Sequence, residues 1–288
     1  MNIASWISFR FFLERCPPDK KKRLAYYLGT PEQEILGKTP VLSRNPFESV
    51  LLIEERLNEI HYSWLIPFLE PFAEMDKLTI VSAAPPLLAK KLHTHFTMDE
   101  DLKEVSSLAK HFIQESIYKW VITDEKEFLP VEFLPDHPLL PLLYLTKSEL
   151  QTLVDFLGLH DIATEISQVI QSEQIKKIER SLSKNQLSYL KGLLKKKEPV
   201  SFARLNLDQW DGNEDKLKKI LHHRGFNRLA KALFGCHPAL LWHISHKFDV
   251  GRSKILRKFF TDINNNKAQE SLINQILELI SSIKKGSE

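Results

Sequence analysis

The chain has 288 residues, a length that suits one large or two ordinary domains. Its composition, 43% hydrophobic and 27% charged, is that of a globular protein and excludes a wholly disordered chain. The net charge of +3 conceals an asymmetry, because residues 161–288 hold 23 Lys/Arg and 14 Asp/Glu whereas residues 1–160 hold 17 and 23. Such opposite halves indicate two different partners or one half that meets a polyanion, although solvated helix faces also explain them.

The cysteine pattern and the N-terminus predict a protein of the cytoplasm. Cys16 and Cys236 lie too far apart in sequence to suggest a disulfide framework, which favours a reducing compartment. The N-terminus lacks a basic region, and Arg10 interrupts the apolar run that a signal peptide would need. No apolar run reaches the roughly 20 residues of a membrane span, so we expect no membrane insertion.

Residues 1–128 predict a helical domain. A helix is expected over 20–28, with Gly29 as the residue that ends it. Asn45 followed by Pro46 is typical of a helix start, and apolar residues at helical spacing predict another helix within 98–122. Residues 78–81 are β-branched enough for a strand, but a strand without a partner is unstable, so we expect little or no sheet.

A proline-rich segment follows this domain. Four prolines between residues 129 and 141 exclude a continuous helix. We therefore predict a linker over 129–144, packed onto the surface, that separates the N-terminal domain from a second helical domain over 145–288.

The second domain is predicted to contain an internal repeat. The apolar residues of 150–166 recur 67 residues later in 217–233. After a slip of one residue, the apolar residues of 175–194 recur in 241–260. Helical repeats bury their apolar stripes against their neighbours, so the expected fold class is all-α, with a C-terminal right-handed stack of armadillo-like helical repeats.

Glycines and helix caps recur with the same spacing. Gly158 and Gly225 are equivalent, and we expect each to end a helix with a positive φ. Ser183 and Asp249 are equivalent and have the side chains of helix N-caps. A final amphipathic helix is predicted over 267–284.

The sequence holds no recognisable catalytic motif. Phosphate-binding glycine loops, the nucleophile elbow, C-x-x-C and H-E-x-x-H are all missing, so we predict neither an enzyme nor a cofactor. Cys236, His237, His243 and His246 lie within eleven residues, and zinc accepts such ligands. Their spacing is not that of a zinc site, so no metal is assigned; a metal-dependent enzyme at this cluster stays an alternative.

The candidate partner-binding residues are basic: Lys195, Lys196, Lys197, Arg224 and Arg228. In the repeat, Arg228 lies off the apolar stripe and is expected to face solvent, with Arg224 and the lysine run beside it as one patch for an acidic partner. The alternative is a nucleic acid bound by the basic half. Base stacking needs free aromatic side chains, and here the aromatic residues fall on the buried stripes, so no nucleic acid is expected.

Two segments resemble known families. Residues 145–194 resemble the helical repeats of FliG, the flagellar switch protein, in 145–150, 161–163 and 182–184. The segments GFNRLAKAL (225–233) and PALLW (238–242) resemble the C-terminal region of SctK, a family of accessory proteins of the type III secretion sorting platform.

The SctK resemblance implies a non-enzymatic cytosolic adaptor. Its expected partners are the cytoplasmic domain of the inner-membrane ring protein SctD and the platform protein SctQ. The protein would then bridge ring and platform while associated peripherally with the secretion complex at the inner membrane.

Overall fold

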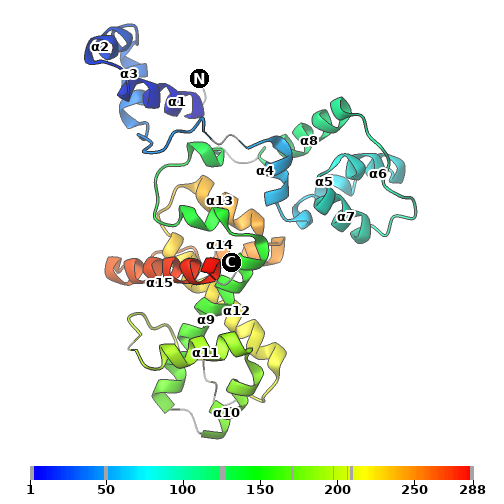
Figure 1. Ribbon diagram of the computed structural model, residues 1–288, viewed down its shortest axis with the longest axis vertical. Coiled ribbons are helices and arrows are strands. Elements are labelled where there is room, and N and C mark those ends of the chain that lie inside the picture. Colours follow the sequence, from blue (N-terminus) through cyan, green and yellow to red (C-terminus); the bar gives the residue numbers. More distant parts are fainter. Residues whose placement is uncertain are drawn as a thin grey trace. The chain divides into compact units, whose positions relative to one another are not determined.

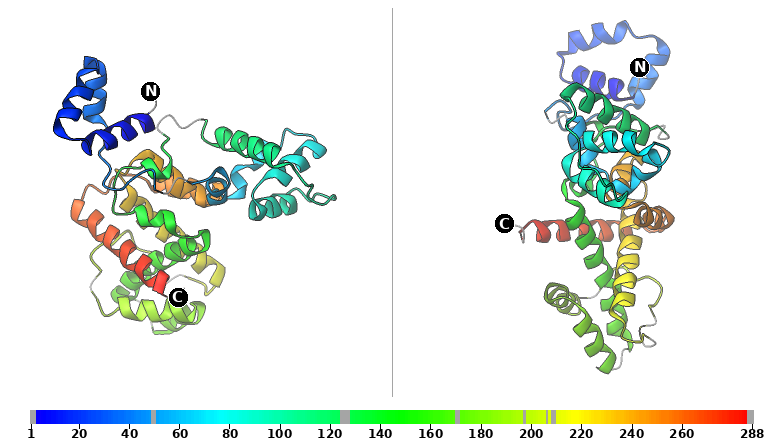
Figure 2. Two further views of the ribbon diagram at one scale, coloured as in Figure 1. Left: turned by 45° about the horizontal axis from the view of Figure 1, so that its top comes forward. Right: turned by 90° about the vertical axis from the view of Figure 1, so that its right-hand side faces the viewer.

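The computed structural model describes residues 3–48, 51–123, 128–169, 172–196, 198–205, 207 and 210–285 (Figures 1 and 2). In these ranges every regular element is a helix, with fifteen α-helices and three short 3-10 helices, so the all-α fold class is confirmed. The chain divides into two compact units. Unit 1 consists of Met1–His137 and His237–Val250, and unit 2 of Pro138–Cys236 and Gly251–Glu288.

Unit 1 is built from short helices. They are α1 (Ile3–Glu14), α2 (Pro18–Tyr26), α3 (Thr30–Lys38), α4 (Ile53–Glu59), η1 (Tyr62–Trp64), α5 (Ile66–Leu69), α6 (Glu74–Ala83), α7 (Pro86–His95), α8 (Ser107–Val121), η2 (Val131–Phe133) and α13 (Pro238–Lys247). Helices α4 through α8 share one hydrophobic core with α13. This core includes Leu57, Val81, Ile117 and Trp242. The last of these residues comes from the C-terminal half of the chain, so residues 237–250 belong with unit 1 and not with the domain predicted over 145–288.

Local hydrogen bonds explain where the N-terminal helices differ from prediction. Gly29 precedes α3 with a φ of −68° and does not end α2 in a left-handed conformation. Asn45 Oδ1 accepts the Phe47 amide at 3.1 Å and closes a turn, so no helix begins at Pro46. The helix expected within 98–122 starts only after Ser106, whose hydroxyl accepts the Ala109 amide as an N-cap.

The proline-rich segment, predicted as a linker over 129–144, packs through its leucines. It forms η2 and η3 (Leu140–Tyr144), and five of its six leucines are buried: Leu129, Leu134, Leu139, Leu142 and Leu143. Arg44 donates to the carbonyl oxygens of Val131 (2.8 Å) and Leu134 (3.0 Å), while Glu132 pairs with Arg56 at 2.7 Å. Proline excludes an α-helix here, but short turns still direct the leucines inward. The boundary between the units falls inside this segment, after His137.

Unit 2 contains longer helices. They are η3, α9 (Lys147–Val169), α10 (Ser172–Ser181), α11 (Lys184–Leu193), α12 (Glu214–Leu233), α14 (Val250–Phe259, except its first residue) and α15 (Asn266–Lys285). Helix bounds recur along the chain, because α13 and α14 begin 66 residues after α10 and α11 (172 to 238 and 184 to 250) and match them in length. The packing differs, since α10 lies in unit 2 and α13 in unit 1, and the right-handed stack stays a prediction.

The predicted helix breaks at Gly158 and Gly225 are wrong. Both glycines lie inside continuous helices, α9 and α12, which run side by side (Figures 1 and 2). A Cβ on Gly158 would lie 2.1 Å from the Leu221 carbonyl oxygen, and one on Gly225 would lie 1.8 Å from that of Val154. Val154 of α9 faces Gly225 of α12, and Gly158, further along α9, faces Leu221, which is earlier in α12. The two helices are therefore antiparallel. These glycines allow close packing and do not end helices.

Candidate partner-binding site

The structure places one residue of the predicted basic patch, Arg228, away from the surface. Lys195 and Lys196 are exposed, whereas Arg224 is half-buried and Lys197 lies outside the described residues. Arg228 is 0% exposed, so its predicted position at the surface is wrong. Its helix, α12, packs against both α9 and α15, which leaves this position no access to solvent.

Arg228 is the centre of a buried ion network. Its Nε and Nη2 donate to Asp161 Oδ1 at 2.9 and 2.6 Å. Its Nη1 donates to Glu198 Oε1 (3.2 Å) and Gln275 Oε1 (2.9 Å), and Nη2 also donates to the Val200 carbonyl oxygen (3.0 Å). These five bonds match the five N–H donors of a guanidinium, so the buried charge is fully paired. The network ties α9, α12, α15 and the chain at 198–200 together.

A second chain of hydrogen bonds leads outward from Glu198. The other carboxylate oxygen, Oε2, lies 2.7 Å from His160 Nδ1, and His160 Nε2 lies 2.9 Å from the Tyr189 hydroxyl. Burial acts to raise the pKa of Glu198, but the hydrogen bond to His160 and the charge of Arg228 outweigh it and lower the pKa. Burial, with the Glu198 carboxylate nearby, strongly raises the pKa of Tyr189. The phenol therefore keeps its proton near neutral pH.

These groups form the floor of a cleft between α11 and α15. The cleft has a volume of about 510 Å³, within the range of small-ligand and peptide sites. Its walls carry Ser188 and Gly192 from α11 and Ser271 and Asn274 from α15, and Lys196 lies at its edge. Hydroxyl and amide groups suit hydrogen bonding to a peptide.

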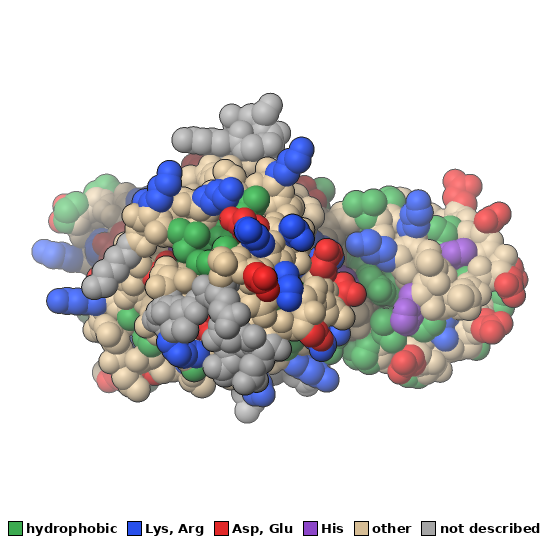
Figure 3. Space-filling view, turned by 90° about the horizontal axis from the view of Figure 1, so that it is seen from below, with side chains coloured by type: hydrophobic (Ala, Val, Ile, Leu, Met, Phe, Trp, Pro, Cys, Tyr) green, Lys and Arg blue, Asp and Glu red, His purple; other side chains and the backbone are tan. Residues whose placement is uncertain are grey.

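Charges of both signs share one face of the molecule. Figure 3 views the molecule from below, where α10 and α11 lie in Figure 1. On that face Lys and Arg side chains are interspersed with Asp and Glu side chains.

Unit 1 exposes an apolar face on α8. Leu108 is 80% exposed and Phe112, one turn later, is 70% exposed. Trp120, further along α8, is 41% exposed, and the centre of its ring lies 5.1 Å from that of the Phe68 ring. The opposite face of α8 is already used, because Ile117 is buried in the core of unit 1. Helix α8 is therefore apolar on two faces, of which one is solvated.

The Cys/His cluster separates into individual contacts. His243 Nε2 donates to the Leu129 carbonyl oxygen at 2.8 Å, and burial lowers the pKa of His243 to about 4. The His246 ring stacks on Trp242 at 4.0 Å, and His237 accepts the amide of Ala239 as the cap of α13. Within the described part of the chain, no three His, Cys, Asp or Glu residues are grouped to hold a metal ion.

Comparisons with protein families, with curated proteins and with solved structures found no match to this chain. No helix in the described ranges is both long and apolar enough to cross a membrane. What the protein binds is therefore inferred from the two surfaces above, the α11–α15 cleft and the α8 face. The sequence did not predict either surface, although the apolar spacing of Leu108 and Phe112 was visible in it.

Proposed function

We propose that the protein is a non-enzymatic adaptor that holds protein partners, one on each of its two units. The observation that carries this proposal is the solvated face of α8. Leu108 and Phe112 stand one helical turn apart and are 80% and 70% exposed. Burying each against a partner would contribute about 1.5–3 kcal/mol, so a partner with an apolar face would bind here.

The cleft of unit 2 supplies a second, unlike surface. Its walls present hydroxyl and amide groups, and its floor is held by the Arg228 network. A floor fixed in this way needs no reordering when a peptide enters, which reduces the entropy cost of binding. The cleft suits a polar segment, whereas the α8 face suits an apolar one.

The resemblance to SctK suggests which two proteins to test as partners. It lies in 225–233 and 238–242, which contain buried packing residues such as Phe226 and Trp242. The resemblance therefore favours a similar helix packing, and it brings with it SctD and SctQ as proposed partners. We propose that the protein bridges these two at the cytosolic side of the inner membrane.

The test uses the full-length chain with Leu108→Ser and Phe112→Ser combined. Leu87→Ser is the matched control, because Leu87 on α7 is 74% exposed and lies on a different helix. Association with the SctD cytoplasmic domain and with SctQ is measured by biolayer interferometry, alongside thermal melts. We expect the double variant to bind one partner at least about tenfold more weakly, with an unchanged melt.

Two results would count against the proposal. If the double variant binds both proteins as tightly as wild type, the α8 face is not a binding surface of the adaptor. A wild-type chain that binds neither SctD nor SctQ overturns the assignment to a secretion platform.

A further inference from the structure

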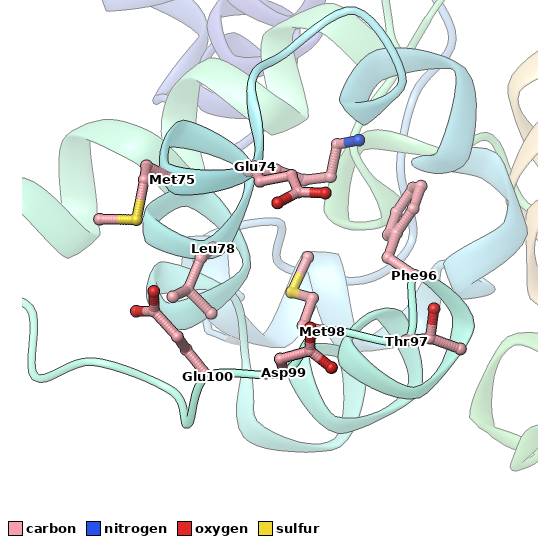
Figure 4. A pocket seen from close by; sticks show the side chains of 9 residues that line it. Glu74, Met75, Leu78, Phe96, Thr97, Met98, Asp99 and Glu100 are labelled. Atoms are coloured by element: carbon pink, nitrogen blue, oxygen red, sulfur yellow. The ribbon is translucent and has the colours of Figure 1, made fainter.

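Unit 1 contains a small pocket whose walls are apolar and whose mouth is acidic. It lies between α6 and the chain after α7, and has a volume of about 200 Å³ (Figure 4). Small-molecule sites usually measure about 300–1,000 Å³, so this pocket has room for one long side chain and not for a cofactor. The pocket uses none of the residues of the α8 face.

The apolar walls come from Leu78 on α6 and from Phe96 and Met98 after α7. Figure 4 shows the Met98 side chain below the Glu74 carboxylate and the Phe96 ring to the right of it, while Met75 points away. Methionine side chains adapt to the shape of what they contact, which suits a flexible guest.

The mouth carries three carboxylates, those of Glu74, Asp99 and Glu100. Glu100 pairs with Lys103 at 3.4 Å, but both side chains are largely solvated, so that pair is weak. Among the described residues, neither Glu74 nor Asp99 takes part in an ion pair. The lining therefore holds three carboxylates against one ammonium group, that of Lys77, which leaves an excess of negative charge.

A cation already lies against the aromatic wall. The Lys77 ammonium group is 4.7 Å from the centre of the Phe96 ring, where the π-electrons favour positive charge. Lys77 thus occupies the aromatic face, and the pocket offers a basic side chain of a partner two features: apolar contact for its stem and carboxylates for its charged end.

We propose that this pocket receives a Lys or Arg side chain from a partner protein. The stem packs on Leu78 and Met98, and the charged end lies between Glu74 and Asp99, apart from the Lys77 ammonium group on the face of Phe96. Charge complementarity selects the occupant, because an acidic side chain would be repelled and an aliphatic one would leave the carboxylates without a counter-charge.

Methyl NMR of the full-length protein tests the proposal. The chain has only three methionines, so ¹³C-methyl labelling gives few signals, and Met98→Leu assigns the one in the pocket. The probes are acetylated, amidated pentapeptides, glycine except for a central Lys, Arg, norleucine or Glu. We expect saturable shifts of the Met98 methyl with the Lys and Arg peptides, larger than those of Met75, and none with Glu.

The variant Glu74→Gln with Asp99→Asn keeps the shape of the pocket and removes two charges. It should weaken Lys-peptide binding about tenfold and reduce its dependence on salt. Glu34→Gln, at an exposed position of α3, is the matched control and should change nothing. Equal shifts with the norleucine peptide would overturn the proposal, as would a Met98 signal that no peptide moves. A Met98 shift produced by protein concentration alone would assign the side chain to a second copy and overturn the assignment to a separate partner.

Discussion

The close packing of α9 against α12 predicts the effect of adding one methyl group at Gly158 or Gly225. The Cβ of alanine would lie 2.1 Å from the Leu221 carbonyl oxygen at the first position and 1.8 Å from that of Val154 at the second. Non-bonded carbon and oxygen atoms keep about 3.3 Å or more between them. The obstacle is backbone inside a helix, so the helices themselves must separate by about 1 Å.

Two opposing effects set the magnitude. Alanine is the better helix former by about 1 kcal/mol, which favours the variant. Inserting a methyl group into a packed contact costs about 1–3 kcal/mol, and here we expect the upper end because no side chain can move aside. The net loss should be about 2 kcal/mol for unit 2. For a unit of this size that corresponds to a fall in Tm of about 4–8 °C.

The assay is thermal unfolding followed by circular dichroism, with Gly192→Ala as the matched control. A Cβ on Gly192, in α11, meets no atom within 4 Å, so this variant should be as stable as wild type or more stable. Gly158 and Gly225 lie at the same crossing, so the double variant should lose less than the sum of the two single losses. A Gly158→Ala variant that melts at or above the wild-type temperature would refute the close packing.

Two further predictions concern buried charge. Burial lowers the pKa of His243 to about 4 in the folded protein. Between pH 6.5 and 4 the unfolded chain therefore binds more protons than the folded one. The free energy of unfolding of unit 1 should fall by about 3 kcal/mol as the pH drops through that range. Urea unfolding at pH 7.5 and 4.5 measures this loss, and His243→Gln, which keeps a donor for Leu129, should remove most of it. Arg228→Met should cost about 3–5 kcal/mol in urea unfolding, because buried Asp161 would lose its hydrogen-bonded cation and Glu198 would keep only His160 and Gln275, while Arg224→Met at the half-buried edge should cost under about 1 kcal/mol.

Local signals in the sequence predicted some helix starts and the spacing of four helices. Ser183 accepts the Gln186 amide and begins α11, as its capping pattern indicated. The 66-residue spacing of the repeat recurs in the bounds of α10, α11, α13 and α14. Caps and apolar periodicity act over a few residues, so one sequence is enough to find them.

Glycine shows where local signals fail. A glycine that ends a helix and a glycine that lets two helices touch look alike in one sequence. Positive φ values belong to Gly212 and Gly235, which flank α12, and not to Gly225 within it. Distinguishing these roles requires the facing helix, which is tertiary information.

The burial of Arg228 was missed for a similar reason. Apolar periodicity assigns a charged residue off the stripe to solvent, but Arg228, Leu229 and Ala230 are consecutive and all buried. A helix enclosed on several sides has no free face there. The repeat held a usable signal, since Asp161 and Arg228 are equivalent positions of opposite charge that bond to each other.

The Arg228 network also links the cleft to the core of unit 2. Glu198 contacts Arg228 on one side and His160 on the other, while Gln275 of α15 contacts both Arg228 and Glu198. A buried ion network adds little net stability over apolar packing of the same volume, so its main consequence here is to fix the positions of the cleft walls. Substitutions in the network would therefore change folding and binding together. Variants that separate the two belong on the exposed rim of the cleft, at Ser188 and Asn274, where a side chain can change without disturbing the arginine.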